Sequence, residues 1–441
     1  MSSTDIEEPH PSAEPLVVRG AKHTVNERIS LWLVMVTVLV VATGMAYTLG
    51  WPSVVRHTSF YWLIPGDIWG TVRASHWIGW GDFSFIYSSR TGLVTLPGFH
   101  LLFTPVVVLC SRLGLAESAP GFIGIPKPSS WLLIGPVILA CSAVALFGCD
   151  ALARAIGAKR GLRRLLTLAV AGVVWPTIAI WGHPEDVVAL GIVAFALAAA
   201  LRGRWTASGW LLGAAVATQL YVIALVPLFI GVAGLRRATA LIARALVIPA
   251  FIFIAVFIPN PHATLHALLD QPNYPTVDHP TPWVHLAPRL GHGAVAAGPS
   301  RIIGLVVATA IGVLTYRRRD NLPVIVWCAG LALSMRCLFE SVMDPYYVMP
   351  AVAVALIVAA TLHWVRFTLA CMASAGITVL TYFRPGEWVY WLEMVGVFLT
   401  LFALTVPQGA LRARARAAES RDGLNGELET RVDSVPATAN H

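Results

Sequence analysis

The sequence predicts an all-α integral membrane protein with about 12 transmembrane helices and a large first outer loop. Of its 441 residues, 57% are hydrophobic and only 12% are charged, whereas soluble domains carry about 25% charged residues. Apolar runs long enough to cross a bilayer recur along the chain and are separated by short basic links. The net charge of +8 therefore fits retention of basic residues at the cytoplasmic face and does not indicate nucleic-acid binding.

The membrane domain is expected to cover residues 29–406. The preceding residues, 1–28, are polar and predict a disordered cytoplasmic tail. Residues 29–50 form the first span, which is long enough to be retained uncleaved. Eleven further spans are expected at residues 131–150, 164–181, 186–201, 206–219, 221–235, 238–258, 302–316, 322–338, 347–363, 367–383 and 388–406. The last segment, 407–441, predicts a basic cytoplasmic tail.

Lysine and arginine clusters predict how the chain is oriented. They lie at 154–164, 202–204, 236–237, 317–319, 366 and 412–416, which the alternation of spans places on the side of the N-terminal tail. That side is the cytoplasm by the positive-inside rule, so both termini of this multi-pass plasma-membrane protein should be cytoplasmic. The outer loops are then 51–130 and 259–301, together with the turn at 182–186.

One apolar segment, Thr95–Leu113, does not fit this alternation as a full span. Counting it as one would place every later basic cluster outside. We therefore expect a re-entrant or interface-lying helix hairpin, kept at the outer surface by Pro97 and Pro105. The six cysteines form no CxxC pair, so neither a disulfide framework nor a zinc site is expected.

The first outer loop contains carboxylates among tryptophan and tyrosine residues. Such a loop at a membrane face can bind a sugar and perform acid–base chemistry. Asp67 follows Pro65-Gly66 at the start of a predicted helix over 67–78, where Asp is a favoured N-cap, and a capping carboxylate can also be a base. Asp82, in Gly-Trp-Gly-Asp, is typical of a turn and is also a candidate substrate contact. Arg73 can pair with a phosphate or hold a carboxylate in place.

A second polar group lies at the turn Gly182-His183-Pro184-Glu185-Asp186. Acidic residues at a helix start are favoured by the helix dipole, so capping alone explains one carboxylate. Three titratable residues at membrane depth are costly and usually functional. His183 with Glu185 or Asp186 can form a metal pair, but two ligands do not make a site, and we expect no bound metal. These three residues are candidate substrate contacts.

A third group lies where one predicted span ends and the next begins. Glu340, Asp344 and Tyr346 fall level with the other outer acids and are candidate substrate contacts. Arg336, near the same end, is the candidate phosphate partner, because a lone arginine at membrane depth needs an anion. The loop 259–301 has five histidines without regular ligand spacing, so it predicts a proline-rich lid over a cavity.

Several of these motifs resemble one family. The chain combines the early acid in PGD67IWGTVRASHWI, the FIY87 and LPGFHLLFTPV runs, and GHPED186 opening a helix that is followed by a Gly-rich span. Over residues 30–400 this is similar to the GT-C superfamily of polytopic glycosyltransferases, above all to actinobacterial polyprenol-phosphate-mannose-dependent mannosyltransferases. The chain departs from many relatives at His183-Pro184-Glu185-Asp186, where a Gln or Asn is common, and at Thr218-Gln219, where a Lys is common.

The resemblance implies a glycosyltransferase that uses a polyprenyl-phosphate-linked sugar donor on the outer face and inverts the anomeric centre. Asp67 matches the family's general base, and Tyr87 lies in a matching run as a substrate contact. The implied partners are a lipid or glycan acceptor and the bilayer, without nucleic acid and without a cofactor. A secondary transporter or lipid flippase remains an alternative, although no internal repeat is visible. A non-catalytic scaffold is disfavoured by the convergence of acids on one face.

Overall fold

The computed structural model describes residues 67–88, 92–115, 131–383 and 385–407, together with Trp32, residues 34–36 and Val38. Both predicted tails, except for residue 407, and most of the first predicted span lie outside the described residues. The described part of the chain is mostly helical. This confirms the all-α class.

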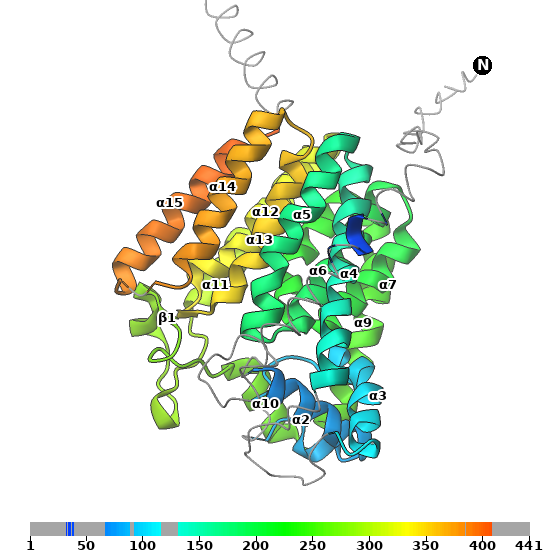
Figure 1. The fold of residues 1–441 in the computed structure, drawn as a ribbon, viewed down its shortest axis with the longest axis vertical. Helices are drawn as coiled ribbons and strands as arrows, with labels where there is room; N and C mark the ends of the chain where they lie inside the picture. The colour runs from blue at the N-terminus through cyan, green and yellow to red at the C-terminus, as the bar shows by residue number, and fades with distance from the viewer. Residues whose placement is uncertain are drawn as a thin grey trace, which may run out of the picture.

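Long helices make up most of the fold (Figure 1). They are α2 (Ile68–Gly79), α3 (Gly98–Arg112), α4 (Trp131–Ala155), α5 (Arg160–Pro176), α6 (Pro184–Leu201), α7 (Trp205–Thr218), α8 (Val226–Ala233), α9 (Leu235–Phe257), α10 (Pro261–Asp270), α11 (Ser300–Tyr316), α12 (Leu322–Phe339), α13 (Val348–Ala359), α14 (Trp364–Leu380) and α15 (Glu387–Thr405). Short helical turns are η1 (Phe83–Phe85), η3 (Thr177–Trp181), η4 (Leu220–Leu225), η5 (Pro282–Leu286), η6 (Gly291–Gly293) and η7 (Pro345–Tyr347). Two short strands, β1 (His279–Pro280) and β2 (Val342–Met343), pair antiparallel.

Each of the eleven spans predicted between residues 131 and 406 coincides with a described helix. The segment predicted at 221–235 is made of two pieces, η4 and α8. Within the described residues, six helices are long and apolar enough to cross a membrane, and five further apolar segments are shorter. The protein is therefore a helical membrane protein by length and composition, while the number of about 12 spans stays a prediction.

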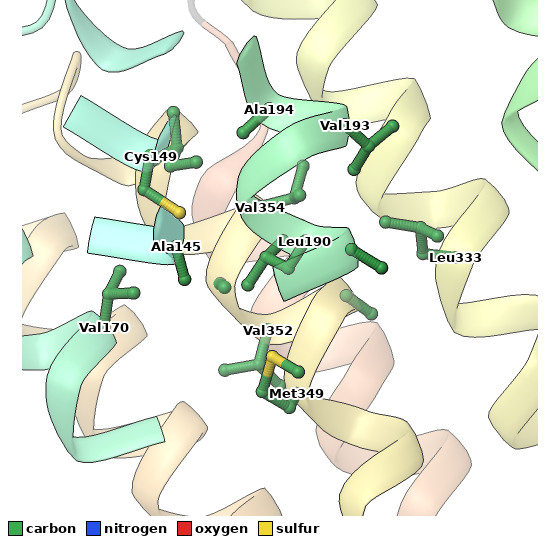
Figure 2. Packing of buried hydrophobic residues seen from close by; sticks show 14 of the residues in the cluster. Ala145, Cys149, Val170, Leu190, Val193, Ala194, Leu333, Met349, Val352 and Val354 are labelled. Carbon is green, nitrogen blue, oxygen red and sulfur yellow. The ribbon is translucent and has the colours of Figure 1, made fainter. Parts of the chain in front are cut away.

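Helices α6 and α13 form the centre of the bundle. In α6, 89% of the residues are buried, and every residue of α13 is buried. Figure 2 shows Leu190 and Val193 of α6 packed among Val352 and Val354 of α13, with Leu333 of α12 beside them. This apolar core holds the ends of the helices, and the side chains they carry, in fixed positions.

Glycines allow α4 and α6 to approach closely. A Cβ at Gly148 would lie 2.3 Å from the carbonyl oxygen of Gly191, and a Cβ at Gly191 would lie 2.4 Å from the backbone of Val144. Backbones this close cannot accommodate a larger residue at either position. Small residues at helix crossings are typical of membrane bundles, where packing is a principal source of helix association.

The segments that the sequence assigns to the outer loops gather at one end of the bundle. In Figure 1, α2, α3 and α10 lie together at the lower end of the long helices, and β1 lies near the lower end of α15. Helix α3 packs against α2, with Ser75 Oγ donating to the carbonyl of His100 at 3.2 Å and Thr104 Oγ1 donating to the carbonyl of Ser75 at 3.2 Å. Residues 98–112 thus form one helix that continues through Pro105 and pairs with α2, so a hairpin within 95–113 is wrong. The relation of this helix to the bilayer remains a prediction.

The second long loop is anchored over the end of α12. Strand β1 pairs with β2 just after α12. Trp283 Nε1 donates to the carbonyl of Leu338 at 2.7 Å, and Ser341 Oγ donates to the carbonyl of Ala296 at 3.1 Å. These contacts fix the loop beside the segment that carries Glu340 and Asp344. The loop therefore covers this part of the bundle, as a lid would, but hydrogen bonds hold it in place at several points.

Candidate functional site

Asp67 occupies the position just before α2, as predicted, but its side chain does not cap the helix. Instead, its Oδ2 lies 3.2 Å from Nε2 of His183. The Asp67 side chain is 60% exposed, so it remains accessible to a substrate. The capping role expected from sequence is therefore wrong, because the carboxylate turns toward the 182–186 turn.

The chain path around Gly182 places His183 beside Asp67. Helix α5 ends at Pro176 and continues as one π-helical turn, η3. Gly182 then adopts a left-handed conformation with φ +78°, which favours glycine. The backbone N–H of His183 donates to the carbonyl of Thr177 at 2.9 Å. Pro184 opens α6, so Glu185 and Asp186 fall in its first turn.

His183 joins the carboxylates of this turn to Asp67. Its Nδ1 lies 2.8 Å from Oε1 of Glu185 and 3.7 Å from Oδ2 of Asp186. The imidazole also stacks on the ring of Tyr346, with centroids 3.7 Å apart. Burial by itself would lower the pKa of His183, but hydrogen bonds to the carboxylates of Asp67 and Glu185 outweigh it and raise this pKa well above its ordinary value. The carboxylates thus stabilise positive charge between them.

Asp186 connects this turn to the interior of the bundle. Its Oδ2 accepts a hydrogen bond from Gln219 Nε2 at 3.1 Å, and its backbone carbonyl accepts one from the Tyr221 hydroxyl at 3.1 Å. Nη1 of Arg336 lies 3.8 Å from Oδ1 of Asp186. The guanidinium of Arg336 lies over the ring of Tyr347, 3.4 Å from its centroid. A continuous chain of polar contacts thus runs from Asp67 to Arg336.

A cavity of about 430 Å³ borders this chain of contacts. Its polar lining comes from Gln219, Tyr221, Gln271, Arg301, Arg336 and Glu340. The remaining lining is apolar and comes from Leu220, Ile223, Ala224, Leu268, Leu269, Gly304, Leu305, Ala332, Leu333, Met335 and Phe339. Among these, Leu269 is 70% and Leu305 is 43% exposed. The cavity therefore combines two guanidinium groups with a wall of exposed apolar side chains.

Arg301 and Glu340 form an ion pair at this cavity. Nε of Arg301 donates to both carboxylate oxygens of Glu340, at 3.0 and 3.2 Å, and the guanidinium also contacts Gln271. Glu340 is buried, so Arg301 compensates its charge. Asp344 is buried as well and accepts a hydrogen bond from the Tyr346 hydroxyl at 2.8 Å.

The structure brings together most of the predicted site residues, but not those further along the first loop. Asp82 accepts a hydrogen bond from Ser84 at 2.6 Å, as a turn residue does. The 12 residues of α2 separate it from Asp67, a distance of about 18 Å at ~1.5 Å per residue. Tyr87 is buried and donates to the carbonyl of Thr95 at 2.9 Å. Arg73 lies half-buried within α2.

Sequence reasoning missed several residues that contact the site. They are Gln219, Tyr221, Gln271, Arg301 and Tyr347. The signal for Arg301 is the one that identified Arg336, a lone arginine at the end of an apolar helix. Gln219 drew attention only as a departure from the family pattern. No sequence signal points to the two tyrosines or to Gln271.

Within the described residues, His183, Glu185 and Asp186 form one group whose ligand atoms lie within 4.8 Å of one another, close enough to hold a metal ion. The five histidines of the 259–301 loop do not belong to it. No protein-family model matches the chain, and no curated protein matches it either. The functional conclusion therefore rests on the chemistry of the site.

Proposed function

We propose that this protein is an integral membrane glycosyltransferase. It moves a sugar, with mannose as the leading candidate, from a polyprenyl-phosphate donor to a lipid or glycan acceptor of the cell envelope. The observation that carries the proposal is the contact between Asp67 and His183, which are 116 residues apart. It joins an exposed carboxylate to a buried polar cluster that borders a cavity with two arginines.

The cavity suits the phosphate and the first isoprene units of the donor. Arg336 and Arg301 offer guanidinium groups, which bind phosphate by paired hydrogen bonds. Nη1 of Arg336 is buried and makes no hydrogen bond within the described residues, so it has donor capacity left for a phosphate oxygen. Exposed apolar residues such as Leu269 and Leu305 continue the cavity toward the outside of the bundle. A prenyl chain can follow this apolar path into lipid.

Asp67 serves as the general base in this mechanism. It accepts the proton of an acceptor hydroxyl while that oxygen forms a bond to the anomeric carbon of the donor sugar. The bond between the anomeric carbon and the phosphate oxygen breaks, and its electron pair leaves with polyprenyl phosphate. Arg336 stabilises the charge that develops on the leaving phosphate. One displacement of this kind inverts the anomeric centre.

His183 holds the Asp67 carboxylate in place through Oδ2. Its Nε2 contacts only one of the two carboxylate oxygens, and the exposed side chain leaves the other oxygen available to a substrate hydroxyl. The stacking of His183 on Tyr346 fixes the plane of the imidazole. Together these contacts restrict the rotation of the Asp67 carboxylate, which favours a defined direction of proton transfer.

Asp67→Asn and Asp82→Asn form a matched pair for testing the proposal. Both variants exchange a carboxylate for an amide at the two ends of α2, but only Asp67 contacts His183. Purified proteins are given radiolabelled polyprenyl-phosphate sugars and an acceptor extract. Transfer should fall about 10²–10⁴-fold in Asp67→Asn, the usual loss for a positioned base, and change only several-fold in Asp82→Asn. Near-normal transfer by Asp67→Asn would place the base elsewhere.

A further inference from the structure

The polar cluster around His183 has more negative charge than its neighbours neutralise. It contains the carboxylates of Asp67, Glu185 and Asp186. Within the described residues, Arg336 is the one guanidinium that contacts them. With His183 positively charged, one negative charge remains, and an ion that replaced the proton on Nδ1 of His183 would face two. Burying uncompensated charge is costly, so the cluster favours a further cation.

Among the described residues, two carboxylate oxygens of this cluster are buried without a hydrogen-bond partner. They are Oε2 of Glu185 and Oδ1 of Asp186, and these residues are only 5% and 1% exposed. Arg336 approaches Oδ1 of Asp186 only to 3.8 Å, beyond hydrogen-bond distance. Most buried polar atoms in folded proteins are satisfied by protein, water or an ion. These two oxygens are therefore buried acceptors that a cation at this position would satisfy.

The spacing of the three side chains matches that of neighbouring ligands on one ion. One donor atom from each of His183, Glu185 and Asp186 lies within 4.8 Å of the others. The distances from Nδ1 of His183 are 2.8 and 3.7 Å. Adjacent ligands on an octahedral ion with bonds of about 2.1 Å lie about 3 Å apart. Small side-chain movements are therefore sufficient to close the three donors around an ion.

Asp67 contributes a further feature of metal sites. It contacts Nε2 of His183, while Nδ1 of the same ring faces the two acids. A histidine that binds a metal through one nitrogen usually donates from the other nitrogen to a carboxylate, a backbone carbonyl or water, which fixes the tautomer and the ring orientation. In this arrangement Asp67 would accept a hydrogen bond from Nε2–H, and an ion at Nδ1 would take the place of the proton that faces Glu185. The four residues thus have the layout of a carboxylate–histidine–metal group.

We propose that His183, Glu185 and Asp186 bind one divalent cation of the Mg²⁺ or Mn²⁺ type, with Asp67 orienting His183. The two carboxylates and the remaining water ligands suit these ions. The charge of +2 balances the two uncompensated negative charges of the cluster. This site goes beyond the proposed transferase function, because cation binding can be measured without donor or acceptor.

Manganese binding to the purified full-length protein tests this site directly. The protein is freed of metal with a chelator, desalted and titrated with Mn²⁺, and free Mn²⁺ is followed by electron paramagnetic resonance. We expect one bound Mn²⁺ per chain, displaced by excess Mg²⁺. Asp186→Asn and Glu185→Gln should each weaken binding by about tenfold or more, since even outer contacts of metal sites contribute 10- to 100-fold. Asp82→Asn, at the far end of α2, should bind as the wild type does.

Two results would overturn the site. The first is wild-type protein that is monodisperse and folded but binds no Mn²⁺ up to about 1 mM, the dissociation constant of the weakest Ca²⁺ sites in proteins. The second is binding that stays unchanged in both Glu185→Gln and Asp186→Asn. Glu185→Gln keeps the side-chain volume, so it provides a folded variant if the more deeply buried Asp186→Asn does not purify.

Discussion

Replacing Arg336 with methionine separates a structural role of this residue from a role in phosphate binding. The Arg336 side chain is 21% exposed and lies 3.8 Å from Oδ1 of the buried Asp186. Methionine fills most of the same space against Tyr347 but leaves the Asp186 carboxylate without its cation. Removing one partner of a buried ion pair costs about 3–5 kcal/mol. We expect the lower end of this range, because Gln219 still donates to Asp186.

The double variant Arg336→Met/Asp186→Asn should regain much of this stability. It removes both charges, and coupling between partners of one network is typically about 0.5–3 kcal/mol. The thermal midpoint of the four proteins in detergent reports this recovery. Polyprenyl-phosphate binding to the same four proteins reports the second role. Loss of a hydrogen bond to a charged group, about 1.5–3 kcal/mol, corresponds to roughly 10- to 100-fold weaker binding.

The two measurements should diverge. Polyprenyl phosphate should bind weakly to Arg336→Met and to the double variant, and normally to Asp186→Asn, although the double variant has recovered its thermal midpoint. If lipid affinity recovers together with the thermal midpoint, Arg336 acts only as the counter-ion of Asp186. The phosphate would then have to bind elsewhere in the cavity, beside Arg301.

Two further predictions concern the bundle. Gly148→Ala should lower the thermal midpoint by an amount equivalent to about 1–3 kcal/mol of overpacking, because its Cβ would meet Gly191. Gly172→Ala, which has open space around it, should leave the midpoint unchanged. Equal midpoints in the two variants would contradict the close crossing of α4 and α6. In a cysteine-free background, exposed cysteines at Leu113 and Val277 should react with an impermeant reagent on intact cells, and one at Ser434 should not. Labelling of Leu113→Cys only after permeabilisation would mean that residues 95–113 cross the membrane.

Composition was sufficient to locate the long apolar helices, but not α10, which lies within the predicted lid. The span predicted at 206–219, for instance, is the helix Trp205–Thr218, whose start follows the Arg-Gly-Arg link at 202–204. The pairing of α3 with α2 was not predictable, since it depends on contacts such as Ser75 to the backbone of His100. Hydrogen bonds between distant segments leave no periodic signal in a sequence.

Part of the site could be predicted from the sequence. Charged residues at membrane depth are costly and usually functional, and this identified Asp186 and Arg336 as candidates. Gln219, which donates to Asp186, is in extended conformation where α7 ends. The sequence predicts a boundary between two spans at this point, but it does not show that the Gln219 side chain reaches Asp186. Asp82 and Tyr87 were grouped with Asp67 because they are near it in sequence. Helix α2 carries them away from it.

The central claim is that the chain cleaves a lipid-linked sugar donor and does not merely move lipids. Its most direct test is mass spectrometry of purified protein incubated with polyprenyl-phosphate mannose and an envelope lipid extract. We expect released polyprenyl phosphate and a mannosylated product in a 1:1 ratio, both strongly reduced with Asp67→Asn. Quantitative recovery of the intact donor from folded wild-type protein, supplied with a complete acceptor extract, would contradict the account and favour a transporter or flippase.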